Sequence, residues 1–229
     1  MIFEKFFKKY NDITLLTCNF NNEKLTMTML ESFNKYVKNF KNIIILDNST
    51  TNPIQILNKK YTVIDNTNFK LTPDFKQVSK NHCCSIDYAF KNLIKTKYVL
   101  LCDNDIIFNK HIVNLLNKRK NFDCIGEIGY DTVPPERIFP YLMICDLDKV
   151  KKKVVDYFDE SRIIKKQEET CEILSSKYGN VYDTGYSFYR DIVNTFVIKR
   201  IRIEDYCIHL KAGSLKNEQE ITDFINKNL

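Results

Sequence analysis

Residues 98–108 read YVLLCDNDIIF, and this stretch decides the fold class. The apolar run from Tyr98 to Cys102 is typical of a strand that is buried on both faces of a parallel sheet. Asp103, Asn104 and Asp105 follow at the carboxyl end of that predicted strand. In open α/β sheets ligands bind beyond the carboxyl ends of the strands, so these side chains are expected at a binding site.

The same pattern extends toward the N-terminus. Short apolar runs that predict strands alternate there with helical patterns. The predicted strands cover residues 13–18, 43–46 and 61–64, and the predicted helices cover residues 23–36, with Asn21 and Asn22 as capping candidates, and 84–95. This alternation predicts an α/β fold with a mainly parallel central sheet flanked by helices.

The second half of the chain is less regular. Its patterns predict a helix at 111–118, a strand at 122–128, an apolar segment at 139–145, a charged helix at 149–178, a short helix at 186–194 and a last strand at 201–210. A chain of 229 residues with 44% hydrophobic residues is long enough to bury a sizeable core in one domain.

Composition narrows the function classes. The net charge of +6 suits an anionic ligand such as a nucleoside diphosphate, and no long basic block indicates nucleic-acid binding. The 8 cysteines form no CxxC pair, so neither a zinc ribbon nor a thioredoxin motif is predicted. Reduced cysteines, an N-terminus unlike a signal peptide and no apolar run near the ~20 residues of a spanning helix favour a cytoplasmic location.

Asp103 and Asp105 are the strongest candidates for a metal site. Two carboxylates two residues apart at a strand end can converge on one divalent cation, and their hard oxygen atoms suit Mg²⁺ or Mn²⁺. Either ion would also bind a diphosphate. The alternative interpretation is a strand-end turn that is simply rich in Asp and Asn.

Several segments together resemble the GT-A glycosyltransferases, especially their family 2-like group, over residues 14–214. The segments that carry the resemblance are 17–20 (TCNF), 44–49 (IILDNS), 78–82 (VSKNH) and 103–105 (DND). The resemblance implies a GT-A domain over residues 1–229. Its Rossmann-like nucleotide-sugar-binding half would take about residues 1–110, and its acceptor half about residues 111–229.

The resemblance also implies a donor site. It assigns a UDP- or GDP-linked sugar to Thr17, Asn19, Asp47, Lys80, Asp103 and Asn104. Asp47 would contact the base, Lys80 stands where an Arg is more usual, and Asp103 would contact ribose or metal. For Asp47 the alternative is a turn residue, and for Lys80 an ordinary surface lysine. The resemblance makes Asp105 the main metal ligand.

Two residues in the second half complete the expected site. His209 resembles the late histidine of some metal-dependent members, whose imidazole can complete the coordination of Mn²⁺; the alternative is a structural histidine. Asp183 resembles the catalytic base of inverting members, although their usual Glu-Asp pair is Tyr182-Asp183 here. The alternative is that Asp183 caps a helix. Asp131 and Asp146 are the next candidates for the base.

The resulting expectation is transfer of a sugar from a nucleoside diphosphate to a glycan or other hydroxyl acceptor, with inversion. The chain could form a homodimer, and no nucleic acid or transmembrane segment is expected. Two alternatives stay open. The segment around Asp103 also resembles the nucleophile segment of haloacid-dehalogenase-like phosphatases, and a nucleotide-sugar-binding protein could have kept the fold without turnover.

Overall fold

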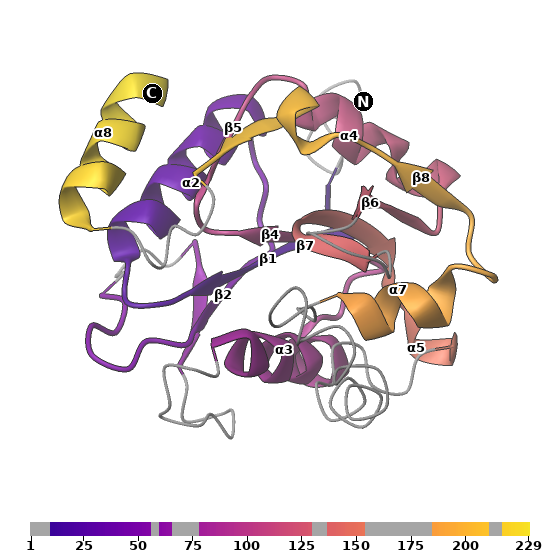
Figure 1. Ribbon diagram of the computed structural model, residues 1–229. Coiled ribbons are helices and arrows are strands. Elements are labelled where there is room, and N and C mark those ends of the chain that lie inside the picture. Colours follow the sequence, from indigo (N-terminus) through magenta and orange to yellow (C-terminus); the bar gives the residue numbers. More distant parts are fainter. Residues whose placement is uncertain (1–9, 56–59, 66–77, 130–136, 154–184, 211–216) are drawn as a thin grey trace, which may run out of the picture.

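The computed structural model describes residues 10–55, 60–65, 78–129, 137–153, 185–210 and 217–229 (Figure 1). Its strands are β1 Ile13–Asn19, β2 Ile43–Asp47, β3 Thr62–Asp65, β4 Tyr98–Asp103, β5 Ile106–Phe108, β6 Cys124–Gly129, β7 Arg137–Asp146, β8 Ile198–Arg200 and β9 Cys207–His209. Its α-helices are α2 Glu23–Tyr36, α3 Val78–Tyr88, α4 Ile112–Lys118, α5 Leu147–Lys153, α7 Tyr186–Ile192 and α8 Glu218–Asn228. Within these residues no helix is long and apolar enough to cross a membrane.

Seven strands form the central sheet, in the order β3-β2-β1-β4-β7-β6-β8. Strands β3, β2, β1 and β4 are parallel neighbours, β7 runs antiparallel to β4 and to β6, and β8 is parallel to β6. Among the described strands of this sheet only β7 opposes the common direction, which confirms the predicted α/β fold with a mainly parallel sheet. The carboxyl ends of β1, β2 and β4 meet at one edge, where Cys18 lies between Leu46 and Asp103.

Helices cover both faces of the sheet. One core contains Leu15 and Leu100 together with the apolar faces of α2 and α4, and the other contains Leu16 and Leu101 together with α3, α5 and α7. Figure 1 shows these two layers on opposite sides of the sheet. Neighbouring residues of β1 and β4 point to opposite faces, so both strands must be apolar throughout, as their sequences are.

Local signals explain the best-predicted helix. The Leu25 amide donates to the Asn22 side chain at 3.1 Å, so Asn22 is the N-cap of α2, as its sequence position suggests. Met29, Leu30 and Phe33 are fully buried against the sheet. The helix begins and ends at the residues that the periodicity predicts.

The cysteines act as small apolar side chains of the core. Those in the described part of the chain are free thiols, and Cys102, Cys124, Cys145 and Cys207 are buried in the core. Burial raises the pKa of each of these four thiols, so they stay protonated near neutral pH.

Some predicted boundaries were wrong. Helix α3 begins at Val78, six residues before the predicted start at Cys84. The predicted strand 201–210 is a strand only from Cys207 to His209, because a short 3-10 helix occupies Ile203–Asp205. Ile203 and Tyr206 are buried there, so the apolar pattern arises from packing without strand pairing. Of the predicted charged helix at 149–178, the structure describes only residues 149–153, which belong to α5. The rest of that prediction lies outside the described residues.

Gly185 joins the start of α7 to the sheet. It has φ +100°, and a Cβ placed on it would lie 2.0 Å from the carbonyl oxygen of Ile138 in β7. We expect Gly185→Ala to lower the free energy of unfolding by about 1–3 kcal/mol from backbone strain alone. Chemical denaturation would measure the effect, with exposed Asn194→Ala as the control. An unchanged midpoint for Gly185→Ala would contradict this close approach.

Candidate functional site

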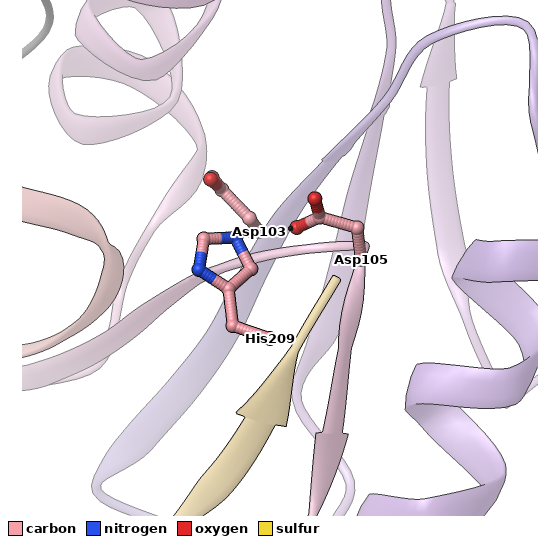
Figure 2. Close-up of side chains that lie close together, drawn as sticks. All are labelled: Asp103, Asp105 and His209. Atoms are coloured by element: carbon pink, nitrogen blue, oxygen red, sulfur yellow. Dashed lines mark ion pairs between the residues drawn. The ribbon is translucent and has the colours of Figure 1, made fainter. Parts of the chain in front are cut away.

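Three side chains converge beyond the carboxyl end of β4. Asp103 is the last residue of β4, Asp105 follows in the turn before β5, and His209 ends β9 (Figure 2). Strand β5 pairs antiparallel with β9, which places Ile106 opposite His209. The Leu210 amide also donates to the Asp105 carbonyl at 2.9 Å. This small second sheet therefore brings a residue from late in the chain to the Asp-Asn-Asp segment.

The geometry of this cluster fits a divalent cation. One potential ligand atom from each of Asp103, Asp105 and His209 lies within 4.8 Å of the others. His209 Nε2 is 3.1 Å from Asp105 Oδ1, and these side chains are only 12% and 8% exposed. Two carboxylates and an imidazole are a donor set that suits Mn²⁺, and the carboxylates alone suit Mg²⁺. The structure thus brings together the three residues that the sequence names as metal ligands.

Asn104 and Asn19 hold the edge of this site in place. Asn104 Nδ2 donates to Thr26 Oγ1 at 3.0 Å, and that hydroxyl donates to Asn19 Oδ1 at 2.8 Å. The side chain of Asn104 is therefore tied to α2, which fixes the turn between the two aspartates. Thr17, another predicted donor-binding residue, is fully buried in β1.

The carboxylate of Asp47, at the end of β2, accepts hydrogen bonds from neighbouring groups of the protein. Its Oδ1 accepts from Asn19 Nδ2 at 3.0 Å and from the Ser49 hydroxyl at 2.5 Å, and its Oδ2 accepts from the Ile54 amide at 2.7 Å. Asp47 is only 3% exposed. The carboxylate thus organises the segment from Ser49 to Ile54, beside Asn19.

The remaining predicted residues fall in different places. Lys80 lies in the first turn of α3. Asp183 and Asp131 lie outside the described residues. Asp146 was a wrong candidate for the base, because β7 runs against the other strands and ends at the opposite edge of the sheet. It pairs there with Tyr98 at the start of β4, and its Oδ2 is 3.5 Å from Lys97 Nζ.

Sequence analysis missed three residues near the cluster. His82 of α3, the last residue of the segment 78–82, places its Nε2 3.9 Å from Asp103 Oδ1, although the resemblance assigns a role only to Lys80 there. The ring of Tyr141 lies 4.7 Å from the imidazole of His209, measured between centroids. Glu127 is partly buried near Tyr141 and His209, and burial raises its pKa. The sequence carried no local signal for Glu127 or Tyr141, whereas His82 stands two residues after Lys80.

Searches with the sequence found no match among family models and none among curated proteins. Comparison of structures did find matches. The yeast (S. cerevisiae) mannosyltransferase Ktr4p aligns with 88% of this chain and 71% of its own, at 11% identity and a TM-score of 0.51. The galactosyltransferase LgtC, solved with donor and acceptor sugar analogues, aligns with 83% of this chain and 73% of its own, at 11% identity and a TM-score of 0.50.

A further match is TarS of S. aureus, residues 1–349, with 18% identity over 62% of this chain and a TM-score of 0.42. The chain spans about half of that structure, 48% of its length. The α/β sheet, its flanking helices and the alignments with Ktr4p and LgtC together show that the chain has the GT-A fold.

Proposed function

We propose that the protein is a metal-dependent glycosyltransferase that moves a sugar from a nucleoside diphosphate to a hydroxyl acceptor. The observation that carries this proposal is the cluster of Asp103, Asp105 and His209 at the carboxyl edge of a GT-A sheet. Ktr4p and LgtC, which share the fold, are a mannosyltransferase and a galactosyltransferase. The two alignments support a glycosyltransferase without naming the sugar.

The cluster would hold Mn²⁺ or Mg²⁺, which when bound neutralises the charge that builds on the leaving diphosphate. The chain itself supplies the rigid frame. Hydrogen bonds from Asn104 to Thr26 and from Thr26 to Asn19 keep the aspartate turn in one position. Preorganised ligands lose little entropy when the charge develops, which is how a fixed site contributes to rate.

In this proposal the UDP- or GDP-linked donor lies along the carboxyl ends of β1, β2 and β4. Thr17, Asn19, Asp47, Lys80, Asp103 and Asn104 form its binding site. Because Asp47 is buried and already hydrogen-bonded, it would act by shaping the segment from Ser49 to Ile54 that faces the donor. Asp183 would take the proton from the acceptor hydroxyl as its oxygen attacks the anomeric carbon, which gives inversion.

A thermal-shift screen of nucleoside diphosphate sugars tests the proposal. With Mn²⁺ present, the right donor should stabilise the fold, by about 2.7 kcal/mol at a concentration one hundred times its Kd. The same donor with a chelator in place of Mn²⁺ is the matched control and should give a much smaller shift. No shift with any UDP- or GDP-sugar in the presence of Mn²⁺ would contradict a donor site.

Asp47→Ala tests the donor end of the site. We expect the variant to bind the donor more weakly by about 1–3 kcal/mol, because the segment that Asp47 holds loses its hydrogen bonds. Titration calorimetry with the donor and Mn²⁺ would measure it. Asp65→Ala is the control, since Asp65 ends β3 directly beside Asp47 but is exposed. Unchanged donor affinity in Asp47→Ala would leave Asp47 as a turn residue only.

The phosphatase alternative has less support. Its nucleophile segment normally lies on the first strand of the fold, whereas Asp103 ends β4, after three other strands of the same sheet. A phosphatase assay and a search for an aspartyl-phosphate would decide it. Hydrolysis of the donor by the protein, measured in the same way, would exclude the alternative of a nucleotide-sugar-binding protein without turnover.

A further inference from the structure

The C-terminal helix α8 packs on the start of α2, and Figure 1 shows the two helices side by side. Asn217 fixes where α8 begins, because its side chain accepts from the Glu220 amide at 3.0 Å and its amide donates to Glu220 Oε2 at 3.0 Å. Ile221 and Ile225 are 3% and 9% exposed and form a small apolar cluster with Leu25 of α2. We call these three residues the α8 cluster.

The α8 cluster also contacts the residue that follows His209. Leu210 packs against the cluster with its side chain. Its amide donates to the Asp105 carbonyl at 2.9 Å. Leu210 therefore connects α8 with the end of β9 and with one aspartate of the metal site.

A second connection runs through α2. Leu25 belongs to the α8 cluster, and the next residue is Thr26. The Thr26 hydroxyl accepts from Asn104 Nδ2 at 3.0 Å, and Asn104 lies in the aspartate turn. Helix α8 thus packs against both parts of the metal site, which are the aspartate turn held by α2 and the strand that carries His209.

Strand β9 needs support from a helix. In the described part of the chain it belongs to a sheet of two strands, whose paired residues are Ile106 with His209, Ile107 with Ile208 and Phe108 with Cys207. Ile208 is 46% exposed, so one side of β9 lacks a covering layer. Two paired strands are only marginally stable by themselves, and packing against a helix stabilises them. The contact of Leu210 with the α8 cluster supplies such packing beside His209.

We propose that Ile221 and Ile225 are positioning residues of the metal site, which hold Leu210 and thereby keep His209 where it can bind a cation together with the two aspartates. The inference rests on the proposed function only in requiring that the site binds a divalent cation. When only a fraction of the molecules has the arrangement that binds a ligand, the apparent affinity falls by that fraction. Undocking of α8 should therefore weaken metal binding, although neither isoleucine carries a ligand atom.

Titration calorimetry with Mn²⁺ alone tests the inference. Ile221→Ala keeps the charge and all three proposed ligands, but it truncates one of the three buried residues of the α8 cluster. We expect it to leave α8 docked in roughly a tenth of the molecules and so to raise the Kd for Mn²⁺ about 10-fold. Ile225→Ala, at a more exposed position, should act in the same direction by a smaller factor. Thermal unfolding in a chelator shows whether each variant is folded before metal is added.

Ile192→Ala is the matched control. It makes the same truncation in α7, within the core on the other face of the sheet. The folded variant should bind Mn²⁺ like the parent protein. An equal rise of the Kd in Ile192→Ala and Ile221→Ala would overturn positioning in favour of general destabilisation. Binding like that of the parent protein in folded Ile221→Ala and Ile225→Ala would also overturn the inference.

Hydrogen exchange of the Leu210 amide, measured in a chelator, separates this inference from the proposed function. The amide donates to the Asp105 carbonyl, so its exchange reports how often β9 separates from the aspartate turn without metal. Exchange should be faster in Ile221→Ala and unchanged in Ile192→Ala. Unchanged exchange in Ile221→Ala would overturn the role of α8 alone, whereas failure of the parent protein to bind Mn²⁺ would overturn the metal site and with it both proposals.

Discussion

Replacing Asp105 by Asn should abolish metal-dependent nucleotide binding while leaving the fold intact. The amide keeps the shape of a side chain that is only 8% exposed and lies 3.1 Å from His209 Nε2, but it removes one negative charge from the cluster. A unit charge 4 Å from another is worth about 4 kcal/mol at an effective dielectric constant near 20. We therefore expect the affinity for a nucleoside diphosphate with Mn²⁺ to fall by roughly a hundredfold or more.

Calorimetry with UDP and GDP, each with Mn²⁺ and with a chelator, would measure this loss. Asp65→Asn makes the same chemical change at the exposed end of β3, outside the metal cluster, and should bind like the parent protein. Circular dichroism would establish that both variants are folded. Unchanged affinity of Asp105→Asn for a diphosphate with Mn²⁺ would contradict the assignment of Asp105 as a metal ligand.

Asp183→Asn should slow sugar transfer by a factor on the order of 10² or more while donor binding and stability are retained. The amide has nearly the shape of the carboxylate but cannot take a proton from the acceptor. Asp183 lies outside the described residues, so its alternative role as a helix cap stays a prediction. The base assignment therefore depends on the resemblance of residues 182–185 and on this experiment.

Turnover should be measured with saturating donor, and the Kd for the donor should be measured separately by calorimetry. Near-normal turnover in Asp183→Asn would exclude it as the base and leave Asp131 or a retaining mechanism. Asp146 is no longer an alternative, since it lies at the opposite edge of the sheet beside Lys97. An equal loss of donor binding and of thermal stability would indicate a structural role for Asp183.

The sequence predicted those parts of the fold that depend on local patterns. Strands β1 and β4 are buried on both faces, so their apolar runs were recognisable without any knowledge of their neighbours. Asp103 and Asp105 could also be found from a local pattern, because both lie in a three-residue segment at the end of a predicted strand. Helix α8 was missed although Asn217 and Glu220 form a capping box that can be recognised in the sequence.

Features that depend on pairing between distant segments were less accessible. His209 was named from the resemblance, and the structure adds the physical reason for its place, which is the pairing of β5 with β9. Tyr141, whose ring lies beside His209, falls in the part of β7 where the register with β6 shifts. No composition or periodicity of either strand marks that shift.

The pairing of β5 with β9 also has a consequence for the order of folding. Phe108 and Cys207 pair although most of the second half of the chain separates them in sequence. The paired residues of β1, β2 and β4 have smaller sequence separations. The entropy of closing a loop grows with its length, and contacts of large sequence separation slow folding. We therefore expect the nucleotide-side sheet to form early and His209 to reach the aspartates late. A bound cation would then fasten the strand pairing that has the largest sequence separation among the described residues.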